Sequence, residues 1–168
     1  MNALLHMDIQ YLFAAIIITY MPFHFLEEAI GDFPSWMFVH HWNPDKLTYG
    51  HWMANNIFFY FPLVVLGLIS FHFMGDKLLF VGAGLIVFGF VETLVHLTYT
   101  MIDRKVSPGL FTSFIFCIIS VLSLYILDMQ NKLTLITVLL SVVFGLIYSF
   151  LPILFCIIFH KTFKKIFG

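Results

Sequence analysis

Residues 78–101 read "LLFVGAGLIVFGFVETLVHLTYTM", and this stretch decides the fold class. Among these residues only Glu92 belongs to the strongly charged types Asp, Glu, Lys and Arg. A helix of roughly 20 apolar residues is long enough to cross the hydrocarbon core of a bilayer. A helix also satisfies all its backbone hydrogen bonds within one segment, as the bilayer interior requires. The stretch therefore predicts a transmembrane helix that carries a carboxyl group inside the membrane.

The rest of the chain has the same character. Of its 168 residues, 61% are hydrophobic and 10% charged, and the mean hydropathy of +1.00 excludes an ordinary soluble domain. The net charge of -1 argues against a nucleic-acid partner. We predict an all-α, polytopic transmembrane helix bundle that forms a single domain over residues 1–168. Its five spans cover approximately residues 9–30, 52–74, 78–101, 110–127 and 133–159.

Basic residues are distributed unevenly between the connections. With five spans, the loop 31–50, the loop 102–107 and the C-terminal tail lie on one side of the membrane. That side carries Lys46, Arg104, Lys105, Lys161, Lys164 and Lys165, and the other side carries Lys77 and Lys132. Cytoplasmic loops are enriched in Lys and Arg. We therefore expect a multi-pass protein of the inner (plasma) membrane, with its C-terminus in the cytoplasm and its N-terminus outside.

The three glutamates of the chain, Glu27, Glu28 and Glu92, all lie within apolar runs. His24 precedes the first two by three and four residues, and His96 follows Glu92 by four. Residues with these spacings share a face of a helix. Both groups fall in the cytoplasmic half of their predicted spans. Because a buried ionised carboxylate is costly, we expect Glu92, the deepest of the three, to be protonated, paired or bound to a cation. Glu27 and Glu28 lie close to the end of their span, so solvation at the membrane surface is an alternative for them.

A third polar group opens the second predicted span from the same side, with His51, Asn55 and Asn56. Imidazole nitrogens and carboxylate oxygens, without thiolates, suit Zn²⁺ best, and iron or manganese also fit. The predicted metal ligands are His24, Glu27, Glu28, His51, Glu92 and His96. A polar network that only joins helices remains an alternative. The sequence also leaves open whether His40 and His41, in the long loop, close over the site.

These groups favour an intramembrane metal-dependent enzyme, a hydrolase that acts on a lipid or another small apolar substrate. Glu27 or Glu28 is the expected general base, and Asn55 and Asn56 are the expected orienting or oxyanion-stabilising groups. A proton- or cation-coupled transporter and a metal-free acid/base lipid isomerase are the alternatives. Membrane lipids are the expected partners, and an oligomer is compatible with each of these hypotheses.

The segment "HFLEE", from His24 to Glu28, resembles the motif of the HXXEE family of small bacterial integral membrane proteins. Three further segments fit that resemblance: "FPSW" at 33–36, "ETLVH" at 92–96 and "SPG" at 107–109. It covers approximately residues 10–110. The resemblance implies a bacterial membrane protein but brings no activity with it, so the functional hypothesis depends on the residues themselves.

Overall fold

The computed structural model describes residues 8–42, 45–62, 65–66, 72 and 74–167, and the prediction of an all-helical chain is confirmed for them. No strand occurs within these ranges. The short elements are α2 (Ile9–Ile18), η1 (Thr19–His24), α3 (Phe25–Ile30), α4 (Phe33–Val39), α5 (Tyr49–Asn55), η2 (Asn56–Tyr60) and η3 (Gly75–Leu78). The long helices are α7 (Leu79–Asp103), α8 (Leu110–Met129) and α9 (Leu135–Phe167).

Helices α7, α8 and α9 are each long and apolar enough to cross a membrane. They correspond to the predicted spans 78–101, 110–127 and 133–159. Their outer faces carry large apolar side chains that are more than half exposed, such as Phe111, Ile118 and Leu139. A soluble monomer rarely exposes so many apolar groups together, whereas lipid tails cover them without cost. The chain therefore has the character of a membrane protein.

The other two predicted spans are not single long α-helices. Residues 9–30 form the consecutive elements α2, η1 and α3, and the π-helical turn η1 contains Pro22. Proline lacks the backbone N–H, and local widening of the helix is a usual response. Residues 52–74 begin with the rest of α5 and with η2, but positions 63–64, 67–71 and 73 lie outside the described residues. Three of the five predicted spans are thus found, and the other two stay predictions.

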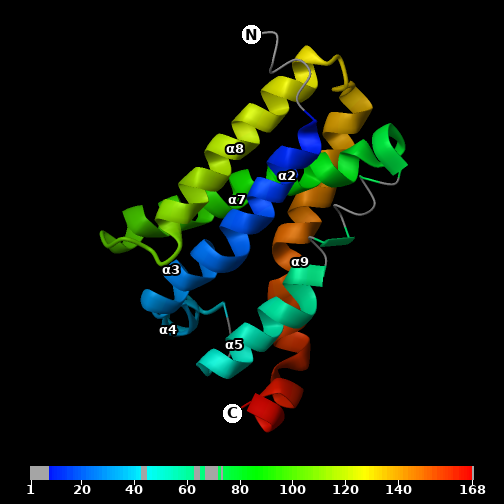
Figure 1. The fold of residues 1–168 in the computed structure, drawn as a ribbon. Helices are drawn as coiled ribbons and strands as arrows, with labels where there is room; N and C mark the ends of the chain where they lie inside the picture. The colour runs from blue at the N-terminus through cyan, green and yellow to red at the C-terminus, as the bar shows by residue number, and fades with distance from the viewer. Residues whose placement is uncertain (1–7, 43–44, 63–64, 67–71, 73, 168) are drawn as a thin grey trace.

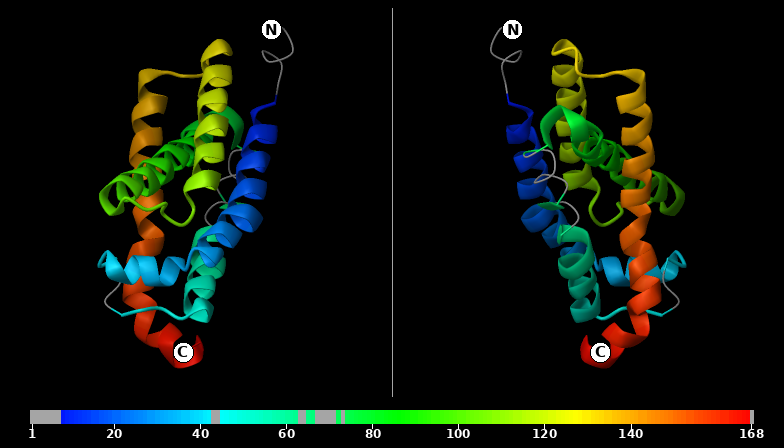
Figure 2. Two further views of the ribbon diagram at one scale, coloured as in Figure 1. Left: turned by 90° about the vertical axis from the view of Figure 1, so that its left-hand side faces the viewer. Right: turned by 90° about the vertical axis from the view of Figure 1, so that its right-hand side faces the viewer.

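Helix α7 packs against both α8 and α9, as Figures 1 and 2 show from three sides. Helix α2 lies along α8, and α5 lies beside the C-terminal half of α9 (Figure 1). Helices α7 and α9 touch at Gly145, where an added Cβ would lie 2.6 Å from the carbonyl oxygen of Gly84. Small residues allow such close backbone approach between membrane helices. The core beside this contact holds the edge-to-face rings of Phe88, Phe116 and Tyr148.

Candidate metal centre

Four side chains from two parts of the chain meet between the lower part of α7 and the η1–α3 junction. His24 ends η1, Glu28 lies on α3, and Glu92 and His96 lie one helical turn apart on α7. One ligand atom from each of the four lies within 4.8 Å of all the others. His24 Nε2 is 3.5 Å from Glu28 Oε1 and 3.5 Å from Glu92 Oε1, and His96 Nε2 is 4.0 Å and 3.9 Å from the same oxygens. We call these residues the four-residue group.

The four-residue group is largely shielded from its surroundings. His24, Glu28 and His96 are each at most 3% exposed, and the Glu92 side chain is 19% exposed. Two ionised carboxylates in such a place repel each other and lose hydration, so they need positive charge nearby. With both imidazoles neutral, a divalent cation would balance the two carboxylates. The donor set of two nitrogens and two carboxylates fits Zn²⁺, iron or manganese.

Both imidazole rings are held from behind by hydroxyl groups. His24 Nδ1 lies 2.7 Å from Thr112 Oγ1, and His96 Nδ1 lies 2.7 Å from Ser107 Oγ. In each ring the other nitrogen, Nε2, therefore faces the carboxylates of the four-residue group. Metal-binding histidines characteristically use their second nitrogen in this way, because the outer hydrogen bond fixes the ring and its tautomer.

Glu27 lies outside the four-residue group, although the sequence predicted it as a ligand and a catalytic base. Its carboxylate accepts hydrogen bonds from the backbone N–H groups of Phe111 (2.9 Å) and Thr112 (2.8 Å) and from Thr112 Oγ1 (2.6 Å). It therefore compensates the unpaired N–H groups and the partial positive charge at the start of α8. Successive helical residues point about 100° apart, so Glu27 and Glu28 face different neighbours.

The Glu27 contact also decides the tautomer of His24. The oxygen of the Thr112 hydroxyl lies near a carboxylate and, at 3.2 Å, near the carbonyl of Gly109, and both of these groups only accept. The single hydroxyl proton must point to one of them. His24 Nδ1 must then be the donor to Thr112, which makes Nε2 the unprotonated nitrogen of the neutral ring. We assign this tautomer from the hydrogen-bond network.

The turn between α7 and α8 closes against both imidazoles. Gly109 has a φ of +94°, and a Cβ there would lie 2.8 Å from Cε1 of His24 and 2.8 Å from Cε1 of His96. Only glycine combines this backbone conformation with such close approach. Pro108 packs on Gly31, where an added Cβ would lie 2.6 Å from the proline Cβ. The segment "SPG", from Ser107 to Gly109, thus forms one wall of the site.

The sequence-predicted residues of α5 and η2 divide between two places. Asn55 and Asn56 line a cavity next to Glu28 and Glu92. His51 is not brought into the four-residue group: its ring stacks on His160 at 6.4 Å and meets Phe163 edge-on at 5.4 Å. The predicted inclusion of His51 therefore has no support from this geometry.

The two loop histidines do not belong to the four-residue group. His40 Nδ1 bonds the Trp36 carbonyl at 2.8 Å, and its Nε2 lies 3.1 Å from Asp103 Oδ1. His41 is exposed, with a φ of 60°. The hydroxyl of Thr112, in contrast, was not predicted from the sequence to belong to the site. A single hydroxyl residue at the start of a helix gives no signal of its role until the helices are packed.

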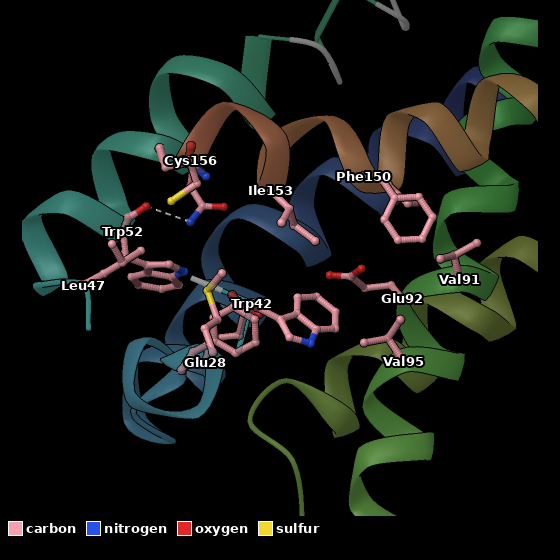
Figure 3. A pocket seen from close by; sticks show the side chains of 15 residues that line it. Glu28, Trp42, Leu47, Trp52, Val91, Glu92, Val95, Phe150, Ile153 and Cys156 are labelled. Carbon is pink, nitrogen blue, oxygen red and sulfur yellow. Dashed lines mark hydrogen bonds between the residues drawn. The ribbon is translucent and has the colours of Figure 1, made fainter. Parts of the chain in front are cut away.

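A narrow cavity of about 70 Å³ adjoins the four-residue group (Figure 3). Glu28 and Glu92 are among its lining residues, whereas the two imidazoles lie behind these carboxylates. Figure 3 shows Glu92 reaching from α7 toward the space in front of α9 and α5. The other lining residues are Phe33, Met37, Trp42, Leu47, Trp52, Asn55, Asn56, Val91, Val95, Ser149, Phe150, Ile153 and Cys156. A molecule in this cavity would approach the group from its carboxylate side.

A comparison with known protein families identifies the segment that contains the four-residue group. The family model described as "Protein of unknown function with HXXEE motif" matches residues 15–126, which include the whole four-residue group. The chain belongs to the HXXEE-motif family. In this HXXEE protein the motif supplies His24 and Glu28 to the group and Glu27 to the start of α8. No curated protein and no solved structure matches the chain significantly.

Proposed function

We propose that this HXXEE protein is an intramembrane metal-dependent enzyme that hydrolyses a lipid or another small apolar substrate. The observation that carries the proposal is the meeting of His24, Glu28, Glu92 and His96 within 4.8 Å in a buried setting. Two imidazole nitrogens and two carboxylates match the ligand types of catalytic zinc and non-haem iron sites. We favour zinc, with iron or manganese as the alternatives.

The chemistry of the proposed site follows from its donors. A bound zinc ion would supply Lewis acidity and would make water a nucleophile at neutral pH. A catalytic zinc site keeps one position for water, so His24, Glu28 and His96 would hold the ion. Glu92, the most exposed member of the group and part of the cavity lining, would then take the proton from that water. Asn55, which lines the same cavity, is placed to donate to a substrate oxygen.

The position in the membrane supports an apolar substrate. We propose five spans, with residues 9–30 and 52–74 crossing the bilayer beside α7, α8 and α9. With this topology, the excess of Lys and Arg favours a cytoplasmic C-terminus and a four-residue group near the cytoplasmic face of the inner membrane. A site at this depth is reached from the lipid phase, which concentrates lipids and other apolar molecules.

Metal analysis of the purified full-length protein tests the proposal. We expect about one equivalent of a transition metal in the wild type and less than about 0.2 equivalents in His96→Ala, because loss of a ligand weakens such sites strongly. His72→Ala is the matched control, because His72 bonds Gln10 at 2.9 Å, away from the group. Equal and negligible metal content in all three proteins would refute the proposal. The four-residue group would then be a metal-free network of ion pairs.

Ion flux separates the enzyme from a transporter that uses the same residues. Proteoliposomes with wild-type protein should show no proton or cation uptake above protein-free vesicles. Uptake that Glu92→Gln abolishes would replace the proposed catalysis with transport.

A further inference from the structure

The cavity beside the four-residue group is long relative to its volume. On α9 its lining extends from Ser149 to Cys156, which are seven positions apart, or about 10 Å at 1.5 Å per residue. The same cavity is bounded by α7 and α5, so it follows α9 between them (Figure 3). The lining is therefore elongated along α9, and the cavity that it surrounds has a volume of about 70 Å³. Pockets for drug-sized ligands typically measure about 300–1,000 Å³, so a broad, rigid ligand would require this cavity to widen more than a thin, flexible chain would.

The cavity walls offer apolar surface along most of this length. Four aromatic side chains line it, namely Phe33, Trp42, Trp52 and Phe150. The polar groups among the lining residues are mostly engaged within the protein. Trp42 Nε1 donates to Tyr99 Oη at 2.9 Å, Asn56 Nδ2 donates to the Trp52 carbonyl at 3.0 Å, and Ser149 Oγ donates to the Gly145 carbonyl at 2.8 Å. A guest therefore meets hydrocarbon, except where Glu28, Glu92 and Asn55 reach the cavity.

One lining residue also lies on the outer surface of the bundle. Phe150 is 56% exposed, and it contributes to the cavity wall on the α9 side. Beside it on α7, Val91 and Val95 are only partly buried. In a bilayer this part of the α7–α9 surface faces the acyl chains. A hydrocarbon chain can thus pass from the lipid phase into the cavity without crossing water.

We propose that the cavity binds one unbranched hydrocarbon chain of a single-chain acyl lipid, with the acyl carbonyl at Glu28 and Glu92. The assignment of this lipid as the substrate rests on the proposed hydrolase, whereas binding of the chain does not. In the reaction the acyl C–O or C–N bond breaks, the OH of water joins the acyl carbon, and the remaining hydrogen goes to the leaving group. A fused-ring sterol is wider and more rigid than a single chain, so it fits this cavity less well.

Photolabelling of the full-length protein tests whether the cavity binds a hydrocarbon chain. The probe is the methyl ester of a straight-chain fatty acid with a diazirine near its tail, because an uncharged ester brings no third carboxylate to Glu28 and Glu92. Peptide mapping locates the label. We expect label on α9 between Ser149 and Cys156 and on α7 near Val95. Excess methyl palmitate should compete, whereas cholesterol should not. A diazirine-bearing sterol that labels the same residues, or fatty-acid label spread evenly over the outer faces, would overturn the proposal.

Variants that fill the cavity make the test independent of the metal. Ile153→Trp should lower labelling about tenfold, equal to about 1.4 kcal/mol in binding. Leu154→Trp is the matched control, because Leu154 is 49% exposed and points away from the cavity. Val95→Trp fills the cavity from the opposite wall and replaces Ile153→Trp if that variant does not fold. Undiminished labelling in a folded cavity variant contradicts the proposal.

Metal content, measured in the same samples, separates the two proposals. Full metal content with no specific labelling would refute binding of the hydrocarbon chain and leave the proposed metal centre intact. Specific labelling without bound metal would support binding of the hydrocarbon chain and refute the metal-dependent hydrolase. The protein would then bind lipid without hydrolysing it.

Discussion

Replacing Thr112 by valine tests the hydrogen bonds behind the metal centre. Valine has nearly the shape of threonine but lacks the hydroxyl that joins Glu27 to His24 Nδ1. Without it, neither the ring orientation nor the tautomer of His24 is fixed. Loss of such an outer hydrogen bond typically weakens metal binding 10–100-fold. At about 1.4 kcal/mol per tenfold, this amounts to about 1.4–2.8 kcal/mol in the binding free energy of zinc.

Competitive titration of zinc against a chelator, at fixed pH in detergent, measures this change. Thr112→Ser keeps the hydroxyl and should bind zinc within about threefold of the wild type, a difference below 1 kcal/mol. Thr98→Val, on an exposed position of α7, controls for the substitution itself. Thermal unfolding of the apo proteins reports any general damage. The reasoning is refuted if Thr112→Val binds zinc as the wild type does, or if Thr112→Ser is impaired as strongly as Thr112→Val.

Three further changes have defined outcomes. Gly109→Ala should destabilise the fold by more than about 1 kcal/mol and abolish zinc binding. The alanine would have a positive φ, and its Cβ would clash with the imidazoles of His24 and His96. Thermal unfolding measures the first effect and metal analysis the second. Glu27→Gln should lower the free energy of unfolding by about 1 kcal/mol, since the start of α8 loses its charge, while keeping part of the zinc affinity; normal stability would contradict the assigned role. Hydrogen bonds from His160 and Lys164 lower the pKa of Asp45, so its contribution to stability is present above the ordinary aspartate pKa of about 3.9 and disappears as pH falls through the lower folded value. Asp45→Asn should remove that part of the pH dependence of the melting temperature, and an unchanged profile would contradict it.

The sequence by itself determined the helical class and the polar pairs along each helix. The apolar composition is compatible with lipid-facing helices and with few other structures. The i, i+4 spacing puts Glu92 beside His96 on α7 independently of the neighbouring helices. The same rule joins His24 to Glu28. These features depend only on the rise and turn of a helix, so they can be read from the chain.

Tertiary structure decided which of these groups meet, because the turn of one helix against another does not follow from the sequence of either. The motif alone could not tell Glu27 from Glu28: rotation of α3 against α7 and α8 sends one carboxylate to the start of α8 and the other to the metal centre. His51 shared the polar character of its neighbours, yet the packing of α5 on α9 puts it against His160. Thr112 became part of the site only where α8 begins beside His24, and no spacing in the sequence encodes that contact.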